Sequence, residues 1–313
     1  MLIFILKRVA FAVLTLLVAS WIAFMLVHLS GSTPGGVALG QSATPEQVTA
    51  YNTEIGWYDP WVAQFANWVG QVLQGNLGVS LIDGREIGPD IAKRLPVTAA
   101  LALGGTVLSA VIGIALGVAA AVRGGTVDRV ITAVTGILLS LPAFWVGVLL
   151  VYFLAVQLRL LPATGFVPFE VSPDKWFRSL VLPVLTIAIT SAGFIARQTR
   201  ASMAEALAQE HIRTLRAVGT PTWRIVYVHA LRSASLPILA SVAVQFIVLF
   251  GGSVMIELLF ALPGIGQAMQ AAVGSADLPF VQALVLVATL VVVIVNLLLE
   301  TLNRTLDPKL RTS

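Results

Sequence analysis

The chain has 313 residues, of which 58% are hydrophobic and only 11% are charged. This balance argues against a soluble globular protein and favours a membrane protein. Cysteine is absent, which excludes a disulfide framework, a thiolate metal site and a cysteine nucleophile.

Six stretches without Asp, Glu, Lys or Arg follow one another along the chain, at 9–29, 95–122, 130–158, 179–196, 233–256 and 278–299. The shortest has 18 residues and would extend about 27 Å as a helix, close to the hydrocarbon thickness of a bilayer. The pattern predicts an all-α integral membrane protein with six transmembrane helices. A cleaved signal peptide is the alternative for the first stretch, but that run is about twice as long as an h-region usually is.

The distribution of lysine and arginine predicts the orientation. With the N-terminus in the cytoplasm, the inner segments carry 13 of the 19 basic residues, although the outer segments are longer. The positive-inside rule therefore places both termini in the cytoplasm. The sequence pI near 9.8 follows from this asymmetry, so no nucleic-acid partner is needed.

Residues 30–94 form a long external connection after the first transmembrane helix, which covers 1–29. Thr44, Pro45 and Gln47 predict the start of a short helix with a capping box. Further on, apolar residues recur at helical spacing, namely Trp61, Phe65, Trp68, Val69 and Val72. Two interpretations stay open for this helix: it lies in the headgroup region of the outer interface, or it packs on the bundle as a rim.

Prolines interrupt the third, fourth and fifth predicted spans, at Pro142, Pro183 and Pro237. Residues 257–280 are apolar yet contain Pro263, Gly264 and Gly266, which do not easily continue a regular helix. We expect an external re-entrant loop there, because irregular backbone at membrane depth is tolerated where protein or water surrounds it. Residues 95–302 would form a five-helix core, followed by a cytoplasmic tail at 303–313.

Motifs that would power or catalyse a reaction are missing. None of the four lysines follows a glycine, so the chain has no P-loop. The six stretches contain no Asp, Glu, Lys or Arg, and His28 lies near the outer end of the first. Glu257 and Glu300 lie at helix ends, so an ion-coupled secondary carrier would lack its usual intramembrane groups. Neither HExxH nor G-x-S-x-G occurs, which disfavours an intramembrane hydrolase.

Residues 197–232, the arginine connection, join the fourth and fifth spans. Good helix formers continue to Val218, and Gly219 suits the left-handed position that ends a helix. Thr220 would cap the next helix and Pro221 would occupy its first position. An apolar face then follows at helical spacing: Trp223, Val226, Tyr227, Ala230 and Leu231. We therefore predict two short helices joined at a tight corner.

The charge of this connection has two interpretations. Its arginines could only satisfy the positive-inside rule and contact anionic headgroups, which is adequate for Arg197, Arg200 and Arg232. A compact helix with a fixed corner is more than a tether requires, so we favour a surface that docks an energy-supplying partner.

The stretch "RTLRAVG", followed by "HALRSASLP", resembles the cytoplasmic signature of permease subunits of ATP-binding-cassette (ABC) importers. That pattern begins Glu-Ala-Ala, and this chain has Arg213, Thr214 and Leu215 in those places and keeps Gly219. Arginine and threonine at the first two positions resemble the dipeptide/oligopeptide/nickel permease branch. "GNLGVSL", "LSLPAFWVGVLL" and "LPGIGQAM" are similar to further family segments, with Leu262 in place of a usual tryptophan.

The resemblance implies a type I ABC importer permease fold and half of a heterodimeric pore, in the first-encoded (B-type) of two permeases. The partners would be a second permease, two cytoplasmic ATPases and an external substrate-binding protein, in the cytoplasmic membrane of a prokaryote. This chain would bind no cofactor and would not be an enzyme, because ATP and Mg²⁺ would be held by the ATPases. The residues coupling it to an ATPase would be Arg213, Thr214, Leu215, Arg216, Ala217, Val218 and Gly219.

The same resemblance suggests import of dipeptides or oligopeptides, with nickel chelates and glutathione-like compounds as alternatives. We expect Gln245, Gly251, Gly252 and Ser253 to line the substrate path, although helix packing is the competing interpretation for each.

Overall fold

The computed structural model describes residues 2–29 and 31–306, and it describes side chains there except at 2–7, 300 and 302–306. Within these ranges the regular structure is helical, apart from one isolated antiparallel bridge between Val79 and Glu86. The chain divides into two compact units: unit 1 combines Met1–Val97 with Pro263–Ile294, and unit 2 combines Thr98–Leu262 with Val295–Ser313.

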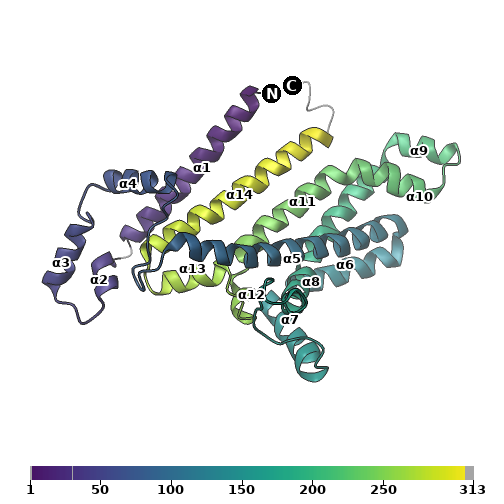
Figure 1. The fold of residues 1–313 in the computed structure, drawn as a ribbon. Coiled ribbons are helices and arrows are strands. Elements are labelled where there is room, and N and C mark those ends of the chain that lie inside the picture. Colours follow the sequence, from purple (N-terminus) through teal and green to yellow (C-terminus); the bar gives the residue numbers. More distant parts are fainter. Residues whose placement is uncertain (1, 30, 307–313) are drawn as a thin grey trace. The chain divides into compact units, whose positions relative to one another are not determined.

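Unit 1 holds the first long helix, the long connection and residues 263–294 (Figure 1). Its helices are α1 (Leu2–Leu29), α2 (Pro34–Leu39), α3 (Pro45–Glu54), α4 (Trp61–Leu73), the start of α5 (Ile87–Arg123), α13 (Ile265–Gly274) and most of α14 (Leu278–Leu306). Its core brings α5, α13 and α14 together through Ile87, Ile91, Ile265, Ala268, Ala272, Phe280, Ala283 and Leu284.

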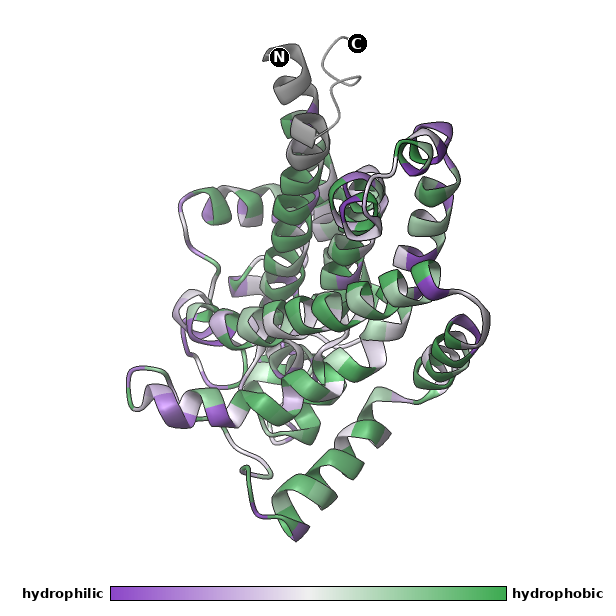
Figure 2. Cartoon of the chain, turned by 90° about the vertical axis from the view of Figure 1, so that its right-hand side faces the viewer, coloured by the Kyte–Doolittle hydropathy of each residue, from purple (hydrophilic) through white to green (hydrophobic). Residues whose placement is uncertain are grey.

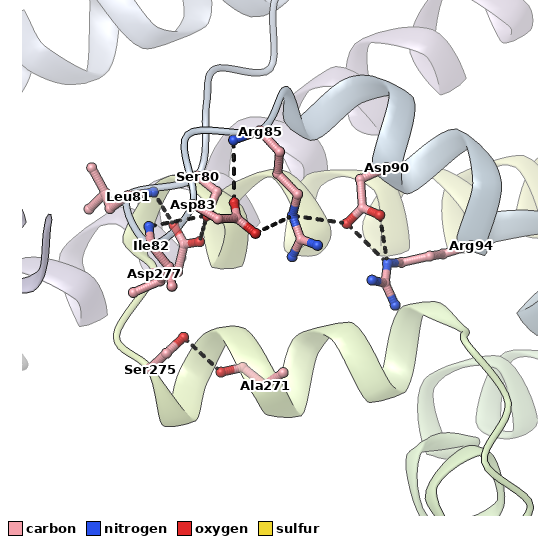
Figure 3. Close-up of polar contacts among 10 residues, drawn as sticks. All are labelled: Ser80, Leu81, Ile82, Asp83, Arg85, Asp90, Arg94, Ala271, Ser275 and Asp277. Carbon is pink, nitrogen blue, oxygen red and sulfur yellow. Dashed lines mark hydrogen bonds and ion pairs between the residues drawn. The ribbon is translucent and has the colours of Figure 1, made fainter.

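A polar cluster pins the turn before α5 to the residue that precedes α14 (Figure 3). The Asp277 carboxylate, buried with a residue exposure of 2%, accepts hydrogen bonds from the Ser80 hydroxyl and, at 3.2 Å, from the Leu81 backbone N–H. Arg85 bridges Asp83 at 3.3 Å and Asp90 at 3.6 Å. Arg85, Asp83 and Asp277 therefore find their partners inside unit 1.

Unit 2 holds the remaining helices. They are the rest of α5, α6 (Gly125–Ser140), α7 (Ala143–Leu150), a π-helical segment (Val151–Gln157), α8 (Pro173–Ala208), α9 (Glu210–Ala217), α10 (Thr222–Arg224), a second π-helical segment (Ile225–Ala230), α11 (Leu231–Gly252) and α12 (Val254–Leu259). One of its apolar clusters joins α5, α8 and the second π-helical segment with α11, through Val118, Met203, Ala206, Val226, Ala230, Ala234 and Ile238.

Glycines set the separation of α5 and α8. A Cβ atom at Gly113 would lie 2.7 Å from the Ile195 Cβ, and one at Gly117 would lie 2.5 Å from the Thr199 Cβ. No side chain fits at such distances, so the two helices pack with their backbones close together. Small residues at a helix contact are typical of membrane bundles.

Five helices of the described chain are long and apolar enough to cross a membrane, and a sixth span is present if a bent pair is counted as one. Figure 2 shows mostly apolar residues along the long helices and hydrophilic residues mainly near helix ends and in connections. The predicted span at 130–158 is this bent pair: α6 and the segment Ala143–Gln157 meet at 97°. Leu141 is extended before Pro142, because a residue that precedes proline avoids the helical conformation.

The prediction that three prolines interrupt the spans is therefore right only for Pro142. Pro183 and Pro237 lie inside α8 and α11, which continue past them. The predicted fourth span, at 179–196, is also too short, since α8 covers Pro173–Ala208.

The long connection contains the predicted helices. The capping box at the start of α3 is confirmed, with the Thr44 backbone N–H donating to Gln47 Oε1 at 2.8 Å and the Gln47 N–H to Thr44 Oγ1 at 3.4 Å. In α4, the Phe65 ring lies 5.0 Å from the ring of Trp21 and 5.7 Å from that of Phe24. These contacts favour the interpretation that α4 packs on the bundle.

The expectation of an irregular loop at 257–280 is wrong in part. Pro263 and Gly264 do lie between helices, but residues 265–274 form α13, and Gly266 lies in its first turn. Extended backbone at Gly264 lets α13 start there, and glycine costs less near a helix end than inside the helix. A dip of this segment into the membrane stays a prediction.

Candidate functional site

The arginine connection contains a short helix that projects from α8. Gln209 has φ −66° and ψ 149°, which ends α8 at Ala208 and starts α9 at Glu210. Sequence reasoning missed this break, because helix formers run through it. Ile212 is fully buried and anchors α9, while His211, Arg213 and Arg216 are exposed.

The end of α9 is a Schellman motif. Gly219 has φ +78°, its N–H donates to the Arg216 carbonyl at 3.1 Å, and the Thr220 N–H donates to the Leu215 carbonyl at 3.0 Å. The predicted left-handed glycine is confirmed, and these two bonds satisfy carbonyls that the helix end leaves open. The corner is consequently a defined structure with a fixed exit direction.

The second predicted helix differs from expectation. Pro221, rather than Thr220, is the N-cap of α10, and the helix starts at Thr222. It then continues without a break to Gly252, so it is the beginning of the fifth span and not a separate short helix. The π-helical segment shifts the faces of the helix: Val226 is 4% exposed, while Trp223 and Tyr227 are 62% and 61% exposed. Local spacing did not reveal this shift.

Most of the residues predicted to couple to an ATPase are accessible. Leu215 is half-buried, and the other six are exposed: Arg213, Thr214, Arg216, Ala217, Val218 and Gly219. By contrast, Arg200 makes a bidentate ion pair with Asp128 and so joins α8 to α6. Among the residues that the structure describes, no carboxylate pairs with Arg213, Arg216 or Arg224.

A pocket of about 520 Å³ lies behind the corner, between the ends of α5 and α8 and the start of α10. Arg216 and Thr220 contribute to its wall. The exposed face of α9 thus borders a recess whose wall residues are mostly apolar.

The four residues predicted to line the substrate path have different surroundings. Gln245 on α11 is 9% exposed, and its Nε2 donates to Ser191 Oγ on α8 at 3.0 Å. Ser253 is buried between α11 and α12, whereas Gly251 and Gly252 are exposed, with open space where a side chain would lie. The described chain has no group of three or more potential metal-binding side chains.

Two family models match this chain. One, described as "Binding-protein-dependent transport system inner membrane component", matches residues 113–312. Its N-terminal companion matches residues 1–102. The chain belongs to this family.

The permease is also similar to curated relatives along nearly its whole length. A Sinorhizobium fredii protein named as a peptide ABC transporter permease, y4tP, is 34% identical over 99% of both chains. A Brucella abortus protein named as a peptide transport system permease is 36% identical over 98% of both. The glutathione transport system permease GsiC of Salmonella typhimurium is 34% identical over 99% of both. The chain is therefore the permease subunit of an ABC importer.

Solved structures agree on the fold. The inward-facing MetNI methionine ABC transporter matches with a TM-score of 0.56 at 20% identity, over 69% of this chain and 96% of that one. An amino acid ABC transporter matches with a TM-score of 0.53 at 16% identity, over 69% and 94%. The permease has the type I ABC importer fold that the sequence predicted.

The sequence analysis did not predict the role of one buried residue, Glu257. It placed this residue at a helix end and assigned it no function. Glu257 is fully buried, and its Oε1 accepts hydrogen bonds from Thr98 Oγ1 at 2.7 Å and Ser253 Oγ at 2.8 Å. A buried carboxylate is stable only with such partners, and here they join α12 to α5. The sequence did contain one indication that this residue is buried, because an acidic residue stands directly before the apolar run "LLFALP".

Proposed function

We propose that this permease forms half of the translocation pathway of an ATP-driven importer of short peptides. The names of the Sinorhizobium and Brucella relatives support the peptide substrate. The name of the glutathione relative supports a glutathione-like substrate as an alternative. Nickel chelates are a further alternative. In this proposal the chain is a transport subunit rather than an enzyme.

The complete importer would contain a second permease, two ATPases and an external substrate-binding protein. ATP and Mg²⁺ would bind to the ATPases, and this chain would hold no cofactor. The positive-inside rule supports cytoplasmic termini in a prokaryotic cytoplasmic membrane, with the arginine connection facing the ATPases. We assign the chain to the B-type permease because of its long first connection.

The observation that carries the proposal is α9, a short projecting helix held by a buried Ile212 and closed by a Schellman motif. Its arginines are exposed, and no carboxylate among the described residues pairs with them. A partner that binds α9 can move α10 with it, because the corner between α9 and α10 is fixed. ATP binding would then favour an outward-facing bundle, provided that the ATPases contact α9 differently in their two states.

Reconstitution of the complete importer in liposomes tests this function. Wild type should take up peptide only with ATP and binding protein. Arg216→Glu should uncouple ATP hydrolysis from uptake, because it reverses the charge on the exposed face of α9. Gly219→Pro should do the same, because proline cannot adopt φ +78° or donate the bond to Arg216.

Arg232→Glu is the matched control, since Arg232 is exposed in the same connection but lies outside α9. It should leave coupling near the wild-type level. Wild-type uptake and normal ATPase co-purification in the Arg216 and Gly219 variants would refute the docking role of α9. Uptake driven by an ion gradient in the isolated chain would instead favour the secondary carrier.

A further inference from the structure

A pocket with basic residues in its wall has no role in the function described so far. It measures about 500 Å³ and lies in unit 2, between residues 159–167 and the start of α8. None of the residues predicted to line the substrate path or to dock the ATPase contributes to it. Its wall combines three cations with apolar side chains: Arg159, Lys175 and Arg178 with Leu160, Leu161, Pro162, Phe166 and Val167.

The three cations lie near one another. Arg178 Nη2 donates to the Leu160 carbonyl at 3.0 Å, which places the guanidinium beside the residue that follows Arg159. Lys175 precedes Arg178 by three residues in α8, so the two lie on one face of that helix. A guanidinium has five N–H donors, and the bond to Leu160 leaves most of those of Arg178 for a ligand.

The same cations are accessible. Arg159, Lys175 and Arg178 are exposed, and none of them pairs with a carboxylate among the described residues. The carboxylates nearest to them along the chain, Glu170 and Asp174, do not line the pocket. A ligand that enters the pocket can therefore meet three positive charges.

The backbone at Arg159 supports a role for its side chain. Arg159 follows the π-helical segment Val151–Gln157 and has φ +53°, and the Leu160 N–H donates to the Leu154 carbonyl at 2.9 Å. Glycine is the usual residue in a left-handed conformation at a helix end, because a side chain is strained there. The turn by itself does not account for an arginine at this position.

The positions of the three cations also run against two general trends. Six basic residues lie on the side that the proposed orientation makes external, and three of them line this pocket. Lys175 and Arg178 occupy the first two turns of α8, where the helix dipole disfavours positive charge. Neither the positive-inside rule nor helix stability explains these cations, whereas an anionic ligand does.

The surroundings of the pocket indicate which anion it takes. One stretch without charged residues ends at Leu158, and the next begins at Ser179. Leu158 and Phe177, which adjoin two of the cations along the chain, are 59% and 65% exposed. Cations beside exposed apolar side chains at the end of a span suit the headgroup region of a bilayer, where phosphates lie next to acyl chains. An acidic soluble protein would match the cations but not the apolar side chains.

We propose that this pocket binds the headgroup of an anionic phospholipid. The lipid phosphate accepts from Arg159, Lys175 and Arg178, and the acyl chains lie against exposed apolar side chains such as Leu158 and Phe177. The volume of the pocket accommodates a small headgroup. Because the cations come from both sides of the pocket, the lipid ties the end of the first π-helical segment to α8. The site requires a membrane protein but does not depend on peptide import.

Lipid binding to the purified importer in detergent, followed by native mass spectrometry, tests the proposal. Dioleoyl-phosphatidylglycerol should bind at least about tenfold more tightly than dioleoyl-phosphatidylcholine, which has the same acyl chains and phosphate but no net charge. High salt should reduce this preference. Equal affinity for the two lipids would overturn the site.

Variants locate the binding site. Arg159→Gly removes the charge and also relieves the left-handed strain, so the melting temperature without added lipid should not fall. The same variant should bind phosphatidylglycerol about tenfold more weakly, and Lys175→Gln and Arg178→Gln should have a similar effect. Lys93→Gln is the matched control, because Lys93 is an exposed basic residue of the same side that does not line the pocket. Unchanged phosphatidylglycerol binding in all three pocket variants would refute the proposal.

Two further measurements distinguish the lipid from other anionic ligands. Excess glycerol phosphate should not displace the lipid, because it has no acyl chains; complete displacement would show that the pocket takes a free anion, and the lipid assignment would be wrong. If the variants bound lipid normally but needed more binding protein for uptake, the pocket would be a protein contact and the proposal would also be wrong. Loss of ATP-driven uptake by wild type, with lipid binding that follows the variants, would remove the proposed function and retain this site.

Discussion

The turn before α5 and helix α9 of the arginine connection both carry charged residues. They differ in whether those residues pair with other residues of the described chain. In the turn, Arg85 pairs with Asp83 and with Asp90 of α5, and Asp277 is buried against Ser80 and Leu81. In the arginine connection, the basic residues of α9 point outward without a carboxylate partner among the described residues.

This difference separates structural charge from charge available to a partner. A buried carboxylate must be satisfied locally, because its desolvation is expensive. An exposed arginine stays hydrated and can pair later with another subunit at small cost. The comparison therefore assigns Asp277 to folding and supports the proposed docking role of Arg213 and Arg216.

The largest effect on stability is expected at Asp277. Asp277→Ala leaves the buried Ser80 hydroxyl and the partly buried Leu81 N–H without their acceptor, so the free energy of unfolding should fall by roughly 2–4 kcal/mol. Thermal unfolding of the purified chain measures the loss, and limited proteolysis should show cleavage near residues 80–86. Asp83→Asn is the control, because the Asp83 side chain is 47% exposed and should change stability little. Equal melting temperatures for the two variants would show that the Asp277 contacts do not hold the turn.

A smaller effect is expected at Arg200, which is the paired arginine of the second region. Arg200→Gln removes the ion pair with Asp128, and the melting temperature should fall by roughly 2 °C, since both groups are partly solvated. Arg197→Gln, at an exposed arginine three residues earlier, should produce a smaller change. High salt should reduce the difference between these variants. A difference that does not depend on salt would argue that the ion pair is not its source.

The smallest effect on stability is expected within α9 itself. Arg213→Gln and Arg216→Gln should leave the free energy of unfolding within about 0.5 kcal/mol of wild type, because both side chains are exposed. The same variants should lower peptide-stimulated ATP hydrolysis in the assembled importer. Destabilisation comparable to that of Asp277→Ala would show that these arginines are structural, and the comparison between the two regions would fail.

Local features of this permease were predictable because they depend on neighbours along the chain. The capping box at Thr44 and Gln47 uses atoms three residues apart, and the Gly219 motif closes within one helical turn. The errors arose where packing overrides local preference. Helix formers run past Gln209 although the helix breaks there, and Pro237 stands within a helix that continues.

The sequence by itself determined the membrane class, the helical composition and the sites of several helix ends, since hydropathy and capping act over short stretches. Only the tertiary structure decided that the third span bends by 97°, that Glu257 meets Thr98 and that Asp277 meets Ser80. The last two pairs lie 159 and 197 residues apart along the chain. No local pattern records such partners, because they become neighbours only when apolar helices pack and the buried polar groups between them must be satisfied.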